Sequence, residues 1–344
     1  MKVAVTAFTP GGLVLASHLT EALRARGHSC SLMVPKRLRG GPADYDSLGE
    51  WTKERFQDSE GLLFVGAAGI AVRAVGPWVR DKFTDPAVVS VDEAGRVAVP
   101  LLSGHVGGAN VLARLVAELS GGIAAVSTAT DVNGLFAVDA WAVEQGLFLD
   151  GREAAKHISA ALLTGESVGV QSDFPIHGEL PRGVVSGPAR LGFSITLERK
   201  KAPFSETLRL IPPCLNVGIG CRRGTPMAAI AGSVERALRS RNLSPRSVRR
   251  ICTIDLKAEE AGLLDFCRES GLPLITYSAE ALRETLGSFT SSDFVREVTG
   301  VDNVCERAAV RAGGELIIPK QAGEGVTVAV SREPFSVIFK GVGA

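Results

Sequence analysis

The chain lacks the paired cysteines that would indicate a zinc site or a disulfide scaffold. Its 344 residues contain six cysteines, and none of them forms a CxxC pair. Free thiols are typical of a reducing cytoplasm, where we therefore place the protein. No set of histidine, cysteine and aspartate has the spacing of a structural or catalytic metal site. We expect no metal bound by the protein itself.

An excess of one charge is also missing. The sequence has 38 Lys and Arg against 37 Asp and Glu, a formal net charge of +1. This balance excludes a globally basic nucleic-acid-binding protein, although a local basic patch remains open. With 45% hydrophobic residues the chain can bury ordinary cores. Its length predicts two or three domains.

No apolar run indicates a membrane span. The N-terminal MKVAVTAF is too short for a signal peptide and is typical of a first β-strand. Residues 61–79 are long enough to cross a bilayer, but they contain Arg73, four glycines and a proline. An arginine at the bilayer centre costs about 2.5–3.5 kcal/mol. A buried strand, a glycine turn and a helix explain this segment better, so we expect no membrane partner.

Strands and helices alternate along the first 133 residues, which predicts an α/β domain. Residues VVSVD and RVAVPLL are joined by a short turn and predict a β-hairpin. A helix follows residues 101–108, because its apolar positions recur at helical spacing. The segment IAAVSTATD then predicts a returning strand.

The remaining chain predicts two further parts. Residues 134–212 combine two helices with short strands and loops, as expected of a small α+β middle module. The alternation of strands and helices restarts in residues 213–344. We therefore predict two α/β domains, with parallel or mixed sheets, flanking the middle module. No period of 20–50 residues repeats, which excludes a solenoid.

The stretch LLSGHVGGAN, residues 101–110, places a histidine among three glycines directly before a helix. Ser103 can cap that helix, and glycines let backbone N–H groups approach a ligand. His105 can exchange a proton near neutral pH. The stretch is neither a Walker loop nor GxGxxG, which disfavours a nucleotide. A functional site is favoured over a capped turn with an incidental histidine, but both stay open.

The segment VGAAGIAVR, residues 65–73, is a second candidate at a predicted strand-to-helix junction. Gly66 and Gly69 follow the strand, and Arg73 comes about one turn into the helix. On its own, this pattern is explained slightly better by a tight turn with a surface arginine.

A third candidate is STATDVNG, residues 127–134, at the predicted end of a strand. Open α/β sheets bind ligands at the carboxyl ends of strands. Asp131 and Asn133 are also typical of an Asx-turn, which is the simpler account. In a parallel sheet, this junction and the two preceding ones are expected to face the same edge.

The fourth candidate is GIGCRRGTP, residues 218–226. Thr225 as N-cap and Pro226 in the first turn predict a helix start. Arg222 and Arg223 would suit carboxylates. A catalytic role for Cys221 is disfavoured, because this domain has no histidine to activate the thiol. Eight arginines and one acid between positions 222 and 250 are typical of a solvated helix face, with polyanion binding as the alternative.

Taken together, these segments resemble the cobalt-precorrin-5A hydrolase family, CbiG of anaerobic cobalamin biosynthesis. The most specific are DPAVVSVDE and LLSGHVGGAN in the N-terminal part. The others are GAAGIAVRAVGPWVRDKFT, STATDVNG, VGIGCRRGT, TIDLKAEEAGL, Ser292–Val295 with Gly300, and VCERAAV through Lys320. The resemblance covers nearly the whole chain in the family's three-part order. It is weak in the middle module, and Cys305 stands where an alanine is more usual.

The resemblance implies a reaction on a ring-contracted cobalt tetrapyrrole. A δ-lactone joining the ring A acetate to the extruded carbon is opened by water. A two-carbon fragment then leaves as acetaldehyde, giving cobalt-precorrin-5B. Cobalt comes with the substrate, and no further cofactor is implied. A general base contributes about 10²–10⁴-fold to such a hydrolysis, and an oxyanion donor roughly 3–4 kcal/mol.

The chemistry of this reaction indicates roles for residues at the matching positions. His105 is the candidate for proton transfer, with Ser103 and Asp131 as further catalytic candidates. The backbone N–H groups of Gly107 and Gly108 are candidates for the oxyanion. The candidate substrate-binding residues are Gly66, Gly69, Arg73, Lys82, Gly104, Gly107, Gly108, Asn110, Thr130, Asn133, Gly220, Cys221, Arg222, Arg223 and Thr225.

Other functions stay open. A non-catalytic corrinoid-binding or delivery protein would use the same basic residues without hydrolysis. A nucleotide-binding or sugar-transfer enzyme fits two α/β domains, but the phosphate fingerprints are missing. Nucleic-acid binding ranks last and would show a steep salt dependence. The expected partner is the tetrapyrrole, with neighbouring corrin-pathway enzymes as a further class.

Overall fold

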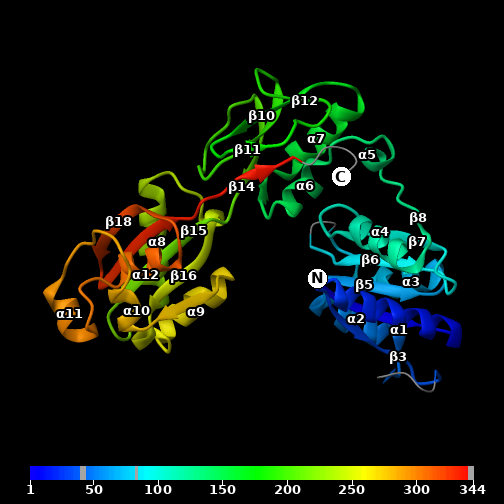
Figure 1. Ribbon diagram of the computed structural model, residues 1–344, viewed down its shortest axis with the longest axis horizontal. Helices are drawn as coiled ribbons and strands as arrows, with labels where there is room; N and C mark the ends of the chain where they lie inside the picture. The colour runs from blue at the N-terminus through cyan, green and yellow to red at the C-terminus, as the bar shows by residue number, and fades with distance from the viewer. Residues whose placement is uncertain (39–43, 82–83, 340–344) are drawn as a thin grey trace. The chain divides into compact units, whose positions relative to one another are not determined.

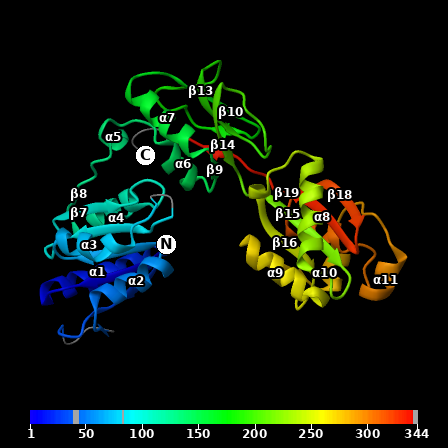
Figure 2. The same cartoon turned by 180° about the vertical axis from the view of Figure 1, so that it is seen from behind.

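The computed structural model describes residues 1–38, 44–81 and 84–339. These residues form two compact units, Met1–Trp141 and Ala142–Ala344, each of which is described by itself (Figures 1 and 2). The expected domain boundaries after residues 133 and 212 stay predictions. Lys82, one of the candidate substrate-binding residues, lies outside the described residues.

The N-terminal unit is built on a six-stranded sheet of order β2-β1-β5-β6-β7-β8 (Figure 1). Its strands are β1 (Lys2–Ala7), β2 (Ser29–Leu32), β5 (Gly61–Val65), β6 (Ala87–Val91), β7 (Val97–Leu102) and β8 (Ile123–Ala124). A separate parallel pair joins β3 (Val34–Pro35) to β4 (Asp44–Tyr45). The helices are α1 (Pro10–Ala25), α2 (Leu48–Asp58), α3 (Ala68–Val75), the 3₁₀ turn Gly76–Trp78, α4 (Ala109–Ser120) and α5 (Ala129–Val132), and α6 (Val138–Glu144) begins in this unit and ends in the next.

Helices cover both faces of this sheet, which explains the apolar strands. All five residues of β5 are buried. Leu63 and Val65 pack into a core with α1 and α4, whereas Leu62 and Phe64 pack into a second core with α2 and α3. A strand covered on both faces is expected to be continuously apolar. Residues 61–79 are therefore β5, α3 and a 3₁₀ turn, and no helix within the described ranges could cross a membrane.

The direction of the strands corrects one expectation. Strands β1, β2, β5 and β6 are parallel, and β6 and β7 form the predicted antiparallel hairpin. Strand β8 then runs parallel to β7, after the crossover through α4. The carboxyl ends of β7 and β8 consequently lie at the opposite edge of the sheet from that of β5. The three candidate junctions of this unit do not share one edge.

The C-terminal unit begins with a second sheet, of order β12-β10-β13-β14-β9. Its strands are β9 (Phe148–Asp150), β10 (Val168–Ser172), β12 (Val184–Val185), β13 (Leu191–Ile195) and β14 (Glu206–Ile211), and its helix is α7 (Arg152–Leu163). Only β9 is antiparallel to its neighbour. The short β11 (Ile176–His177) pairs with β20 (Val337–Ile338), close to the end of the chain.

A further five-stranded sheet, of order β17-β16-β15-β19-β18, completes this unit. Its strands are β15 (Leu215–Cys221), β16 (Val248–Ile254), β17 (Leu274–Tyr277), β18 (Glu315–Gly323) and β19 (Val326–Arg332). The helices are α8 (Met227–Ser240), α9 (Ala261–Ser270), α10 (Ala279–Arg283), α11 (Asp293–Thr299) and α12 (Cys305–Ala312), with 3₁₀ turns at Pro245–Ser247 and Asp255–Lys257. The predicted mixed α/β class is confirmed, whereas α11 was not expected as a helix.

Candidate functional site

The loop that carries His105 connects the end of β7 to α4. Ser103 has a positive φ of 56°, and its main-chain oxygen accepts a hydrogen bond from the N–H of Ala109. The expectation that Ser103 caps the helix is wrong. The N-cap position is Gly108, and no side chain caps the helix there. The Ser103 hydroxyl is buried and has no hydrogen-bond partner among the described residues.

The glycines of this loop are needed for packing. A β-carbon on Gly107 would lie 2.3 Å from the Ser103 Cβ, and one on Gly104 would lie 2.8 Å from the Asn110 Oδ1. The N–H of Gly108 already donates to the His105 carbonyl oxygen. Of the two N–H groups expected to bind the oxyanion, only that of Gly107 donates no hydrogen bond to another described residue.

The imidazole of His105 lies between two carboxylates. Its Nε2 is 3.0 Å from Asp131 Oδ2, and its Nδ1 is 3.2 Å from Asp139 Oδ1. The Thr130 hydroxyl lies 3.3 Å from the same Nε2. Asp131 comes from α5, after β8, and Asp139 comes from α6. The ring therefore joins three segments of the N-terminal unit.

Two side chains of α4 hold Asp131 in place. The Asn110 amide nitrogen donates to Asp131 Oδ2 at 3.0 Å and to the Thr128 hydroxyl at 3.0 Å. Arg114, one turn further along the helix, donates to Asp131 Oδ1 at 2.9 Å. Asn110 is buried, and both printed contacts of its amide nitrogen go to this segment, so it positions Asp131.

The pKa values of this cluster follow from these contacts. The hydrogen bond to Asp139 raises the pKa of His105 above its ordinary value, and burial of the ring only partly opposes it. Burial favours the neutral form of Asp139, but the hydrogen bond and charge of His105 outweigh it and lower the pKa of this carboxyl. The cluster therefore favours an imidazolium flanked by carboxylates, and a histidine whose pKa is perturbed by specific partners is a candidate for acid–base chemistry.

The junction at residues 65–73 is not part of this cluster, because it follows β5 at the other edge of the sheet. Gly66 has φ 154°, and a β-carbon there would lie 2.8 Å from the Phe8 ring. Gly69 and Arg73 are exposed in α3. A tight turn with a surface arginine accounts for this segment.

The junction at residues 127–134 does meet the histidine, although not as a strand end. The expected strand stops at Ala124, and residues Ala129–Val132 form a short helix. Thr130 is buried beside the ring, whereas Asn133 is exposed and donates its amide to the Ala129 carbonyl oxygen. Of the residues expected here, Asp131 and Thr130 belong to the cluster and Asn133 does not.

The arginine pair of residues 218–226 lies on the C-terminal unit. Arg222 and Arg223 are exposed, and neither has an ion pair among the described residues. Thr225 is not the expected N-cap: its hydroxyl donates to the Arg222 carbonyl oxygen at 2.8 Å, and Pro226 occupies the cap position. A β-carbon on Gly220 would lie 2.6 Å from Thr327 Oγ1, so this glycine is required by packing.

Cys221, next to that pair, has the properties of a structural thiol. Burial raises the pKa of Cys221, and the nearby charge of Lys257 compensates only in part. A neutral thiol is a poor nucleophile. A catalytic role for this cysteine is not supported.

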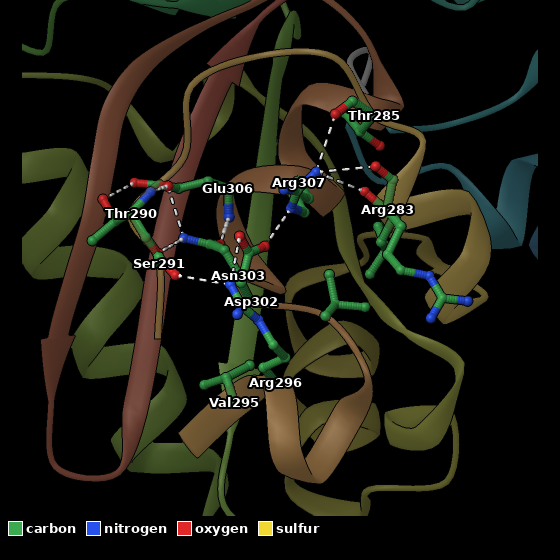
Figure 3. A network of polar contacts seen from close by, with 12 residues as sticks. Arg283, Thr285, Thr290, Ser291, Val295, Arg296, Asp302, Asn303, Glu306 and Arg307 are labelled. Carbon is green, nitrogen blue, oxygen red and sulfur yellow. Dashed lines mark hydrogen bonds and ion pairs between the residues drawn. The ribbon is translucent and has the colours of Figure 1, made fainter. Parts of the chain in front are cut away.

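A buried polar network stabilises the C-terminal unit at the start of α12 (Figure 3). Glu306, 1% exposed, accepts hydrogen bonds from the N–H and hydroxyl of Thr290, the Asn303 amide and the Lys320 N–H. Arg307 pairs with Asp302 and donates to the carbonyl oxygens at the end of α10. Because contacts of this network join α10, residue 290 and β18 to the start of α12, we interpret it as structural.

Two residues of the cluster, Asp139 and Arg114, were not among those predicted from the sequence. Arg114 lies four residues after Asn110, a spacing that places both on one face of α4. That spacing was the available signal. Asp139 had none, because its carboxylate reaches His105 from a separate helix 34 residues away.

The fold defines an α/β protein, and this cluster is its candidate acid–base site. Three family models cover the chain: "Cobalamin synthesis G N-terminal" matches residues 50–131, "Cobalamin biosynthesis central region" 136–212 and "Cobalamin synthesis G C-terminus" 215–331. The chain belongs to the CbiG family of cobalamin biosynthesis proteins.

Two curated relatives of the chain carry the same name. A cobalt-precorrin-5A hydrolase of Salmonella typhimurium is 34% identical over 95% of this chain and 96% of its own. One of Priestia megaterium is 30% identical over 81% of this chain and 80% of its own. A solved cobalamin biosynthesis protein G homologue of Sulfolobus solfataricus is 20% identical over 96% of this chain and 97% of its own, with a TM-score of 0.44.

Proposed function

We propose that this chain is a cobalt-precorrin-5A hydrolase. Relatives with that name match it over most of its length. The observation that carries the proposal is the placement of His105 between Asp131 and Asp139, a proton-transfer group in a protein of this family. The reaction opens the δ-lactone of a cobalt tetrapyrrole with water and releases acetaldehyde.

Both steps of this reaction need a proton carrier. In the first, water adds to the lactone carbonyl, the ring C–O bond breaks and the leaving oxygen takes up a proton. In the second, the resulting hydroxyl loses its proton, the C–C bond breaks and acetaldehyde departs. The electron pair stays on the macrocycle carbon, which takes up a proton. His105 is the side chain we assign to the proton transfers at the leaving oxygen and at the resulting hydroxyl, which contribute about 10²–10⁴-fold each.

The substrate carries acetate and propionate groups, which need cationic partners. Arg222 and Arg223 are exposed without ion pairs among the described residues, and we assign them to these carboxylates.

Cobalt belongs to the substrate in this proposal, and no resident cofactor takes part. The six free thiols support a cytoplasmic location. We further propose neighbouring corrin-pathway enzymes as partners of this chain.

The test is release of acetaldehyde from cobalt-precorrin-5A, followed by NADH consumption with alcohol dehydrogenase. We expect turnover by the wild type and a loss of about 10²–10⁴-fold in kcat for His105→Ala. His105→Gln is the control, because glutamine keeps a hydrogen bond but cannot carry a proton. Full activity of His105→Gln would reduce His105 to a positioning role. Tight binding of the tetrapyrrole without acetaldehyde would indicate a delivery protein instead.

A further inference from the structure

Each nitrogen of the His105 ring faces a carboxylate oxygen, at 3.0 Å for Asp131 and 3.2 Å for Asp139. A carboxylate only accepts hydrogen bonds, whereas a neutral imidazole has one donor and one acceptor. A neutral ring would therefore point a lone pair at one negative oxygen. An imidazolium donates to both. The arrangement fits the protonated ring.

The two carboxylates do not act on the ring equally. Asp131 also accepts from the Arg114 guanidinium and the Asn110 amide, so a second cation compensates much of its charge. The described partners of the Asp139 carboxylate are His105 and the N–H of Ala140. Its side chain is also less exposed, at 14% against 22% for Asp131. The negative charge of Asp139 therefore stabilises mainly the positive charge of the His105 ring.

We propose that Asp139 is the positioning residue that keeps His105 an imidazolium at rest, so that the site starts its cycle as a proton donor. The charged groups facing the ring are Asp139 from α6 and Asp131 from α5, with Arg114 from α4 behind Asp131. The protonation state follows from these contacts alone. The order of the chemical steps rests on the proposed function.

A resting imidazolium sets the order of proton transfers. Water attacks the lactone carbonyl and loses one proton to solvent, and His105 gives its own proton to the oxygen that leaves when the lactone C–O bond breaks. The ring is then neutral and lies beside the hydroxyl just formed. It takes the proton back from that oxygen as the C–C bond breaks, and solvent protonates the macrocycle carbon. One histidine thus acts as acid and then as base, and ends the cycle protonated.

The protonation state is tested on the free full-length protein by NMR titration of the histidine ring ¹³C and ¹⁵N signals. We expect His105 to titrate above the ordinary value of about 6.5. Asp139→Asn preserves the shape of the side chain and removes the charge, which is expected to lower the pKa of His105 by about one unit or more. Asp139→Glu restores the charge and is expected to return most of the shift.

A matched control comes from a second histidine–carboxylate pair, His157 with Glu206, in the C-terminal unit. Glu206→Gln is expected to leave the His105 titration unchanged. Asp131→Asn is expected to move it less than Asp139→Asn does. An unchanged His105 pKa in Asp139→Asn, or a neutral ring in the wild type at pH 6, would overturn the proposal.

The enzymatic readout separates this proposal from the proposed function. In the acetaldehyde assay, the pH dependence of kcat should show activity that needs protonated His105 and is lost as the pH rises through its pKa. In Asp139→Asn this loss should begin at lower pH. If the NMR pKa moves but no variant or wild type releases acetaldehyde, the positioning role holds and the proposed function fails.

Discussion

Gly104 and Gly107 lie where a β-carbon has no room, because the turn after β7 folds back on itself. The histidine between them contributes nothing to that packing, since its ring points to Asp131 and Asp139 instead. The glycine-rich pattern thus has two separate causes. The glycines allow the turn, and the turn presents His105 to the carboxylates of α5 and α6.

This separation predicts the effect of Gly107→Ala. The added carbon would lie 2.3 Å from the Ser103 Cβ and 2.9 Å from the Ser103 carbonyl oxygen, so the backbone must shift. Overpacking of this kind costs about 1–3 kcal/mol. We expect a lower melting temperature for the N-terminal unit in calorimetry of the full chain, together with lower activity.

Gly69→Ala serves as the control for that variant. This glycine lies in the first turn of α3, and among the described residues an added β-carbon would meet only Arg73 Nη1, at 3.7 Å. Alanine in a helix is favoured over glycine by roughly 0.5–1 kcal/mol. The control should be as stable as the wild type or more so. Equal destabilisation by both variants would contradict the packing argument.

At this scale the sequence indicated part of the site. His105 could be predicted because it stands in a glycine-rich junction, and Asp131 because it stands near the expected end of a strand. Ser103 was selected for capping, but its positive φ takes it out of the capping geometry. Asp139 could not be selected, since its contact with His105 depends on where α6 packs, which no local pattern records.

Among the elements, the crossover β7–α4–β8 decides where the site lies. The hairpin of β6 and β7 reverses the chain, and the parallel pairing of β8 with β7 keeps the reversed direction. The hairpin was predictable from two alternating runs with a short turn. The hairpin also places the carboxyl ends of β7 and β8 at the edge of the sheet opposite to that of β5. The prediction of one shared edge was wrong because it assumed that all strands run in the same direction.

The start of α12 provides a prediction at the same scale. The Glu306 carboxylate receives four hydrogen bonds, two of them from Thr290 and one each from Asn303 and Lys320. Glu306→Ala would remove the partner of the buried Asn303 amide and of three part-buried donors, and an unpaired buried donor costs about 1–3 kcal/mol. We expect a loss of at least ~3 kcal/mol in the unfolding free energy of the C-terminal unit, measured by urea denaturation.

Hydrogen exchange of the full chain locates the effect. Peptides covering residues 285–304 should exchange faster in Glu306→Ala, because their link to α12 is broken. Glu306→Gln should lie between that variant and the wild type, since one amide oxygen still accepts. Glu297→Ala, on the exposed side of α11, is the control and should change neither readout. If residues 285–304 exchanged as slowly in Glu306→Ala as in the wild type, the structural role of this network would be contradicted.

At the scale of the whole molecule, the candidate residues fall on two units. The histidine cluster belongs to Met1–Trp141, and the arginine pair belongs to Ala142–Ala344. Alternation of strands and helices was sufficient to predict the α/β class of both ends of the chain. It could not assign chemistry to one end, because both ends have glycine-rich junctions with polar residues.

The arginine pair provides the test of what the C-terminal unit contributes. Arg222→Ala combined with Arg223→Ala removes two exposed cations that the described structure leaves without ion pairs. Charge-assisted hydrogen bonds to a carboxylate contribute about 1.5–3 kcal/mol each. We expect a rise in KM for the tetrapyrrole of about tenfold or more, with kcat little changed, because His105 and its carboxylates are untouched. Steady-state acetaldehyde release over a range of substrate concentrations measures both constants.

The matched control removes the same charge from the other end of α8. Arg239 and Arg241 are exposed and lie roughly 20 Å along the helix from the pair, at 1.5 Å per residue. Arg239→Ala with Arg241→Ala should leave KM unchanged if the site is local. An equal rise in both double variants would indicate a general effect of charge. An unchanged KM in the Arg222 and Arg223 variant would show that the substrate carboxylates are bound elsewhere.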